Sequence, residues 1–211
     1  MWEHRLVWTA AKPSWWSAAW AHGLEVLLRQ KREPEKRPDT YVVCSDRLDV
    51  GLKLRGGDSD EFDVKVLHQR SGPWELWEKV PFFKWNSLEV VRLAALLRVK
   101  PPDSGLPEKA TPAEGAQAFL TAAGIETLQI TVAKTRIQGR AGDLLATVPE
   151  TAVVSSWLAE LAEIEIEGRD AFSVCLESLD PVQGGIEVLP WEGAVACGYP
   201  ELLVRLSSGS L

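Results

Sequence analysis

Basic side chains stand at alternate positions around a glycine-rich turn in the run GLKLRGGDSDEFDVKVL, residues 51–67. Alternation on both sides of such a turn is the sequence form of a β-hairpin, and alternate residues of a strand point to one face. Lys53 and Arg55 therefore share a face with Lys65 of the partner run, opposite the leucines and valines. Three cations on one face can bind the oxygens of an anion, although most hairpins of this kind expose such a face to water.

The same Lys-x-Arg spacing returns at Lys134 and Arg136, within the run TLQITVAKTRIQ at residues 127–138. The run is rich in β-branched residues and predicts another strand. If no bulge intervenes, its two cations lie on the side of Ile130 and Val132.

Carboxylates also alternate with apolar residues. Glu3 and Arg5 share one face of a strand predicted at the start of the chain. Residues 151–167 are long enough for a helix or a strand, but Glu163 and Glu165 alternate with isoleucine, which favours a strand that displays an acidic row.

The predicted strands together carry six cations and three carboxylates on their polar faces. If these strands closed into a barrel, buried cations without partners would require an anion of matching charge. A polyphosphate would supply that anion, and a neighbouring carboxylate pair could hold Mg²⁺ or Mn²⁺. Such an arrangement is typical of phosphoryl chemistry, in which the protein positions and neutralises the substrate. The residues are Arg5, Lys53, Arg55, Lys65, Lys134, Arg136, Glu3, Glu163 and Glu165.

Helices are predicted beside these strands. Ser14 is the candidate N-cap of a core-facing helix that ends near Lys31. Residues 199–206 could form one or two helical turns that cap the end of the sheet. The apolar side of the first helix would carry Trp16, Trp20, Leu24, Leu27 and Leu28.

Capping boxes mark two further helices. Asn86 precedes the nearly wholly apolar run 88–99, which we expect to be covered on more than one side. Thr111 pairs with Glu114 at the start of a helix predicted over residues 112–123, which ends at a glycine.

The remaining elements are extended or irregular. Residues 39–45, 74–80 and 171–178 predict strands. Residues 30–38 (QKREPEKRP) predict a solvated loop, and residues 100–112 hold four prolines and predict an exposed linker.

Composition predicts one globular domain over residues 1–211. Hydrophobic residues make up 45% and charged residues 25%, which are ordinary values for a folded chain. The linker divides this domain into a first half of about residues 1–99 and a second half, 113–211, that repeats its plan. Ten tryptophans suit core packing above all, and also a core lined by a polar cavity or an interface with a protein partner.

Charge and cysteine content narrow the function classes. The net charge of −7 argues against a general nucleic-acid binder. Three cysteines without CxxC spacing indicate reduced structural thiols and no zinc site. The N-terminus lacks a long apolar segment and no later run has the length of a membrane span, so we expect a cytoplasmic protein without membrane contact. No pattern favours a particular oligomeric state.

The order of these motifs resembles the CYTH-type triphosphate tunnel metalloenzymes. The matching runs are DTYVVCSDRLDVGLKLRGG, then DVKV, TVAKTR and AEIEIEG. The resemblance spans most of the chain. It implies an α+β fold, an eight-stranded antiparallel β-barrel with helices outside that is built from two similar halves, and it implies hydrolysis or cyclisation of a triphosphate with a divalent metal. Carried over, Lys53, Arg55, Lys65, Lys134 and Arg136 would bind phosphate and Glu163 with Glu165 would bind Mg²⁺ or Mn²⁺.

The first strand departs from the family's Glu-x-Glu-x-Lys signature. The chain has Glu3, Arg5 and Val7 at these positions, so a cation replaces one metal-binding carboxylate and the lysine is lost. We place Arg5 with the phosphate binders and Glu3 with the metal ligands on the shared inner face. The sequence then allows two functions. One is a metal-dependent phosphohydrolase that acts on tripolyphosphate, a nucleoside triphosphate or thiamine triphosphate. The other is a catalytically impaired module that binds a phosphorylated ligand or a protein partner.

Overall fold

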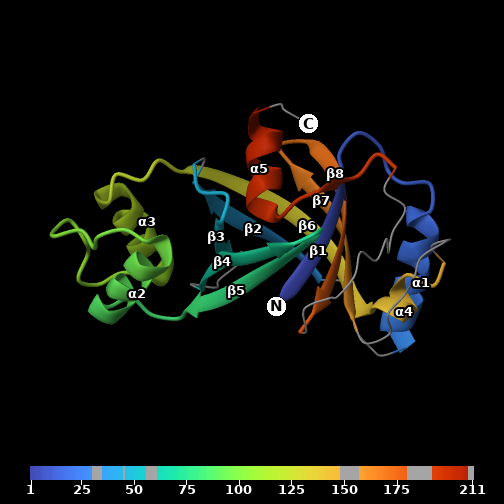
Figure 1. Cartoon of the computed structure of the whole chain (residues 1–211), viewed down its shortest axis with the longest axis horizontal. Helices are drawn as coiled ribbons and strands as arrows, with labels where there is room; N and C mark the ends of the chain where they lie inside the picture. The colour runs from blue at the N-terminus through green and yellow to red at the C-terminus, as the bar shows by residue number, and fades with distance from the viewer. Residues whose placement is uncertain (30–34, 45, 56–60, 148–156, 180–191, 209–211) are drawn as a thin grey trace.

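Eight antiparallel strands form a closed barrel in the computed structural model, which describes residues 1–29, 35–44, 46–55, 61–147, 157–179 and 192–208 (Figure 1). Their order around the barrel is β5-β4-β3-β2-β6-β7-β8-β1, and β1 pairs again with β5. The predicted eight-stranded antiparallel barrel is therefore confirmed. The bounds are β1 (Trp2–Trp8), β2 (Glu35–Val43), β3 (Val50–Arg55), β4 (Phe62–Ser71), β5 (Trp74–Phe82), β6 (Leu128–Arg140), β7 (Leu158–Ile166) and β8 (Arg169–Ser178).

The first strand closes this barrel. β1 pairs with β8 along its whole length, from Trp2 to Trp8. On its other edge β1 pairs with β5 only at Trp2 and Glu3, and with the short strand β9 (Val195–Ala196) farther along. The seam between β1 and β5 is thus the shortest pairing of the closed ring.

The described residues form five helices, which lie outside the barrel or at its ends. Figure 1 shows α2 and α3 together at one end of the molecule, α1 and α4 at the other, and α5 against the strands between them. Their bounds are α1 (Trp16–Arg29), α2 (Ser87–Leu97), α3 (Pro112–Ala122), α4 (Ala141–Leu144) and α5 (Tyr199–Ser208). None of the described helices has the length and hydropathy needed to cross a membrane.

Tryptophan packing holds α1 against the outer face of the barrel. Trp16 and Leu27 of α1 are buried in a cluster to which seven of the ten tryptophans contribute. Gly23 permits this close approach, because a Cβ there would lie 2.4 Å from Cδ1 of Ile137 on β6. Most tryptophans therefore serve core packing, as predicted, whereas Leu28, predicted to face the core, is 55% exposed.

The capping signals of α2 and α3 are confirmed. The Asn86 side chain accepts hydrogen bonds from the first backbone amides of α2, and Thr111 with Glu114 forms the reciprocal capping box of α3. Both helices cover the outer apolar face of β3 and β4. The expectation that α2 is covered on more than one side is wrong, because Leu88 and Val91 are exposed.

The C-terminal helix α5 covers the inner face of the barrel at one end. Its buried Leu202, Leu203 and Leu206 pack with apolar residues of β2, β6 and β7, among them Tyr41 and Ile164. Along each strand these apolar residues alternate with residues of the outer face. Their side chains therefore point into the barrel, as the polar side chains of its interior do. The predicted cap at the end of the sheet is confirmed.

Two boundaries differ from the sequence-based expectation. Residues 35–38 were expected in a loop, but β2 begins at Glu35 because Glu35–Val43 pairs continuously with β6. The ambiguous run 151–167 is a strand from Leu158 onward, since β7 pairs with β6 and β8 on its two edges. The predicted hairpin turn at 56–60 and the start of that run at 151–156 lie outside the described residues.

Candidate functional site

The interior of the barrel holds a chamber of about 650 Å³. All six basic residues singled out from the sequence line it, and they come from β1, β3, β4 and β6. A seventh, Lys79 of β5, was missed, although its pairing with Lys65 in the β4–β5 ladder places it on the same face. The basic residues are Arg5, Lys53, Arg55, Lys65, Lys79, Lys134 and Arg136, and the acidic ones are Glu3, Asp63, Glu78, Glu160 and Glu177.

Strand register explains why the hairpin of β3 and β4 faces the chamber. Lys53 lies opposite Asp63 and Gly51 lies opposite Lys65, so the polar residues of the two strands share one face. Leu52 and Val64 occupy the other face and are fully buried under α2 and α3. The alternation read from the sequence is confirmed, and burial of the apolar face directs the cations inward.

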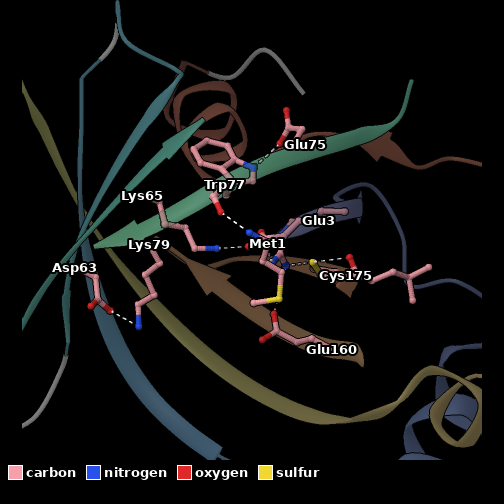
Figure 2. Close-up of polar contacts among 12 residues, drawn as sticks. Met1, Glu3, Asp63, Lys65, Glu75, Trp77, Lys79, Glu160 and Cys175 are labelled. Atoms are coloured by element: carbon pink, nitrogen blue, oxygen red, sulfur yellow. Dashed lines mark hydrogen bonds and ion pairs between the residues drawn. The ribbon is translucent and has the colours of Figure 1, made fainter. Parts of the chain in front are cut away.

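Two buried aspartates hold the cations of this hairpin. Nζ of Lys53 lies 2.5 Å from Oδ2 of Asp39 on β2. Oδ2 of Asp63 lies 2.8 Å from Nη2 of Arg55 and 3.1 Å from Nζ of Lys79. Figure 2 shows Lys79 directed at Asp63. Sequence reasoning gave neither aspartate a role, although Asp63 was placed on the polar face of its strand.

Glu160 of β7 is the centre of a second group of charges. Its carboxylate accepts hydrogen bonds from Lys134 Nζ at 2.6 Å, Arg136 Nη1 at 3.0 Å and Arg5 Nη1 at 3.3 Å. Gln138 Nε2 donates a fourth at 3.2 Å. Burial opposes ionisation of this carboxyl, but the pull of Lys134, Arg5 and Arg136 prevails and holds the pKa of Glu160 well below its ordinary value. Glu160 is therefore a carboxylate at neutral pH.

A third group lies across the seam of the barrel. Nζ of Lys65 on β4 donates to Oε1 of Glu3 on β1 at 2.5 Å, as Figure 2 shows. Glu3 stands opposite Glu177 in the β1–β8 ladder. Burial, together with the charges of Glu3 and Glu160, raises the pKa of Glu177. Glu177 thus keeps its proton to a higher pH than a glutamate in water does.

Internal pairing overturns one step of the sequence argument. Unpaired buried cations were expected to require an external anion, but each of the six has a carboxylate oxygen within 4.0 Å. The barrel interior is therefore neutralised largely by its own carboxylates. Seven basic and five acidic side chains line the chamber, and Asp39 adds a further carboxylate behind Lys53.

The predicted metal ligands on β7 do not face this chamber. Glu163 lies on the outer face, where its Oε1 accepts hydrogen bonds from Trp16 Nε1 and Lys12 Nζ, each at 3.0 Å. Glu165 is exposed. Ile164 between them and Ile166 after them pack inward under α5, so strand alternation turns this acidic row outward. Only Glu160, two residues before Ala162 on the inward side, brings a β7 carboxylate into the chamber.

The charge arrangement does not fit a divalent metal ion. A magnesium or manganese site needs several oxygen ligands free to converge on the ion. Here Glu160 already accepts from three cations and Glu3 from Lys65. No group of three or more acidic, histidine or cysteine side chains within the described part of the chain is placed to hold a metal.

Two tyrosines form the wall next to α5. The rings of Tyr41 and Tyr199 stack with centroids 5.4 Å apart. Arg5 lies 4.3 Å and Lys134 5.0 Å from the centroid of the Tyr199 ring, on which each makes a cation–π contact.

The three cysteines are free and buried, as predicted.

Several solved structures resemble this fold at low identity. A putative adenylate cyclase from Bacillus halodurans is 12% identical, with 84% of this chain and 81% of that chain covered and a TM-score of 0.36. A putative adenylyl cyclase from Hippeastrum, described as having a dominant triphosphatase activity, is 11% identical over 100% of this chain and 85% of that one, with a TM-score of 0.41. A protein from Pyrococcus horikoshii is 11% identical over 85% and 80%, with a TM-score of 0.40. No family model and no curated protein matches the sequence.

Proposed function

We propose that the barrel chamber binds a small phosphorylated anion of the polyphosphate class, in a divergent relative of the tunnel enzymes that the sequence resembles. The observation that carries this proposal is the convergence of seven basic side chains from five strands on one chamber. Lysine and arginine donate charge-assisted hydrogen bonds to phosphate oxygens. A ligand with several phosphate groups can contact cations on opposite walls at once.

The paired carboxylates set the conditions for binding. Lys53, Arg55 and Lys79 each contact an aspartate, so an anion must share these cations with the protein's own carboxylates. Charged hydrogen bonds contribute about 1.5–3 kcal/mol each, which is enough for several contacts to favour a polyanion over a single phosphate. We therefore expect affinity to rise from phosphate to pyrophosphate to tripolyphosphate.

Hydrolysis of the ligand with Mg²⁺ or Mn²⁺ is the second candidate. The observation that favours hydrolysis is Glu177, a chamber carboxyl whose pKa is raised by burial and by Glu3 and Glu160, because a carboxyl with a raised pKa is better suited to proton transfer than an ordinary glutamate. The carboxylates of Glu3 and Glu160 already contact lysines of the protein, which favours binding without hydrolysis instead. Release of inorganic phosphate from tripolyphosphate or a nucleoside triphosphate separates the two candidates.

Calorimetric titration with tripolyphosphate tests the binding proposal. Removal of one cation in Lys53→Ala or Arg55→Ala should weaken binding by about 1.5–3 kcal/mol. The control is Lys100→Ala, whose ammonium pairs with Asp103 on the exposed surface and should leave affinity unchanged. Equal affinity in wild type and in both chamber variants would refute the site, and the lack of any heat or thermal shift with polyphosphate would refute the function.

A further inference from the structure

Arg5 occupies a singular position among the chamber cations. Its Nη1 donates to Glu160 at 3.3 Å and to Ser173 Oγ at 2.8 Å, and its Nη2 lies 4.0 Å from Oε2 of Glu3. The guanidinium thus lies within 4.0 Å of two of the chamber glutamates, whereas Lys65 contacts Glu3 and Lys134 contacts Glu160. One cation bridges two acidic side chains that lie on different strands, β1 and β7.

The surroundings fix this guanidinium in place. Arg5 is 7% exposed, its plane is in contact with the Tyr199 ring, and it lies opposite Cys175 in the β1–β8 ladder. Cys175 in turn lies opposite Glu160, so the three residues form one row across β1, β8 and β7. Arg5 therefore cannot move out to solvent without breaking contacts on three sides.

The charge of Arg5 does for these carboxylates what a divalent ion would do. Two buried carboxylates on strands separated only by β8 repel each other unless a cation lies between them. A guanidinium offers five N–H donors in a fixed plane and keeps its proton at all ordinary pH values. A metal ion would need the same carboxylate oxygens and the same space.

We propose that Arg5 is a built-in cation that replaces a divalent metal between Glu3 and Glu160, so that the chamber binds its phosphorylated ligand without any metal ion. The inference rests on the proposed function for the identity of the ligand. It also predicts a gain of metal binding when the guanidinium is removed, because Oε2 of Glu3 and one of the contacts of Glu160 are then released, although Lys65, Lys134 and Arg136 stay in place. Arg5, and not a metal ion taken up from solution, then sets the charge of this part of the chamber.

Two titrations test the proposal independently of each other. In the first, wild type is titrated with tripolyphosphate in excess EDTA, and affinity should equal that measured after dialysis without added metal. In the second, wild type, Arg5→Gln and Arg5→Ala are titrated with Mn²⁺ alone and free Mn²⁺ is followed by its paramagnetic resonance signal. Wild type should show no saturable Mn²⁺ binding over the titrated range. The two variants should saturate, with dissociation constants at least about tenfold below the highest Mn²⁺ concentration used.

Control variants separate the bridge from a general charge effect. Arg136→Ala also removes a cation from Glu160, but it leaves Arg5 in place and should gain no Mn²⁺ binding. Arg5→Gln with Glu160→Gln should lose the gained site, since one carboxylate is gone. Arg5→Gln keeps donors for Ser173 and Glu160, so it guards against misfolding of the alanine variant.

The outcomes distinguish this inference from the proposed function. Loss of tripolyphosphate binding in EDTA, saturable Mn²⁺ binding by wild type, or equal Mn²⁺ binding by Arg5→Gln and wild type would overturn the role of Arg5. If wild type binds no polyphosphate with or without metal, the proposed function fails, and the Mn²⁺ titrations still decide whether Arg5 excludes a metal.

Discussion

Each chamber cation is held by a particular carboxylate, so a substitution at one residue changes both binding and stability. The ammonium of Lys53 contacts the carboxylate of Asp39, a buried residue that is 1% exposed. Among unpaired cations, alanine at this position would relieve repulsion and leave the fold intact or stabilise it. The observed ion pair reverses that sign.

We predict that Lys53→Ala lowers the free energy of unfolding by about 1–3 kcal/mol, because it removes a partner from a buried carboxylate. Asp39→Asn in the same chain should recover part of this loss, since a neutral amide costs less to bury than a carboxylate. Urea denaturation of the single and double variants measures both effects. A Lys53→Ala protein as stable as wild type would contradict the pairing.

Protonation of Glu177 should make stability depend on pH. Its folded-state pKa is raised by burial and by Glu3 and Glu160, so the folded protein holds this proton over a range where the unfolded chain has lost it. Stability contributed by the site therefore falls as pH rises through the unfolded value of about 4.3 toward the folded value. Glu177→Gln should be more stable than wild type at pH 7 and equal to it below that range, by thermal unfolding. The same difference at both pH values would contradict this assignment.

The position of α5 determines which part of the barrel interior is apolar and which part is polar. α5 covers the inner apolar residues of β2, β6 and β7, and the cations and carboxylates lie on the same faces farther along these strands. Tyr199 and Pro200 at the start of α5 also line the chamber. The helix thus contributes both to the core and to one wall of the site.

We expect Leu203→Ala in α5 to lower the free energy of unfolding by about 2–5 kcal/mol, the usual cost of a cavity left by a buried leucine. Ser207→Ala, on the exposed side of the same helix, should change stability by no more than about 0.5 kcal/mol. Guanidinium denaturation provides the comparison. Equal effects of the two substitutions would show that α5 does not pack inside the barrel.

At the scale of the whole molecule, closure of the barrel depends on a short seam. β1 pairs with β5 at two positions, whereas β6 and β7 pair at nine. The ion pair between Lys65 and Glu3 crosses this seam and belongs to the chamber. A change at this ion pair would therefore affect barrel closure as well as the proposed ligand site.

We predict that backbone amides of the β1–β5 seam exchange with deuterium faster than those of the β6–β7 ladder, because fewer hydrogen bonds must break to open it. Tripolyphosphate should slow exchange at the seam more than in the β6–β7 ladder, since a ligand that bridges opposite walls favours the closed ring. Hydrogen exchange followed by mass spectrometry measures both. Uniform protection of all strands, with and without ligand, would contradict the prediction.

The sequence by itself determined most of the strands, the helix caps and which cations share a face of their strand. These features follow from local alternation and local hydrogen bonds, such as the Lys53–Arg55 spacing or the Thr111 capping box, and they need no distant partner. Which carboxylates meet these cations depended on tertiary structure. Asp39 and Glu160 are far in sequence from Lys53 and Arg5, so barrel register alone brings each pair together.

The acidic row of β7 shows most clearly what the local sequence could not determine. Alternation established that Glu163 and Glu165 share a face, but both faces of a strand can be covered in a barrel with helices on either side. The packing of α5 against Ile164 from inside and the hydrogen bond of Trp16 to Glu163 from outside decide which face is which. Both contacts join segments far apart in the chain, and local sequence carries no information about their energy.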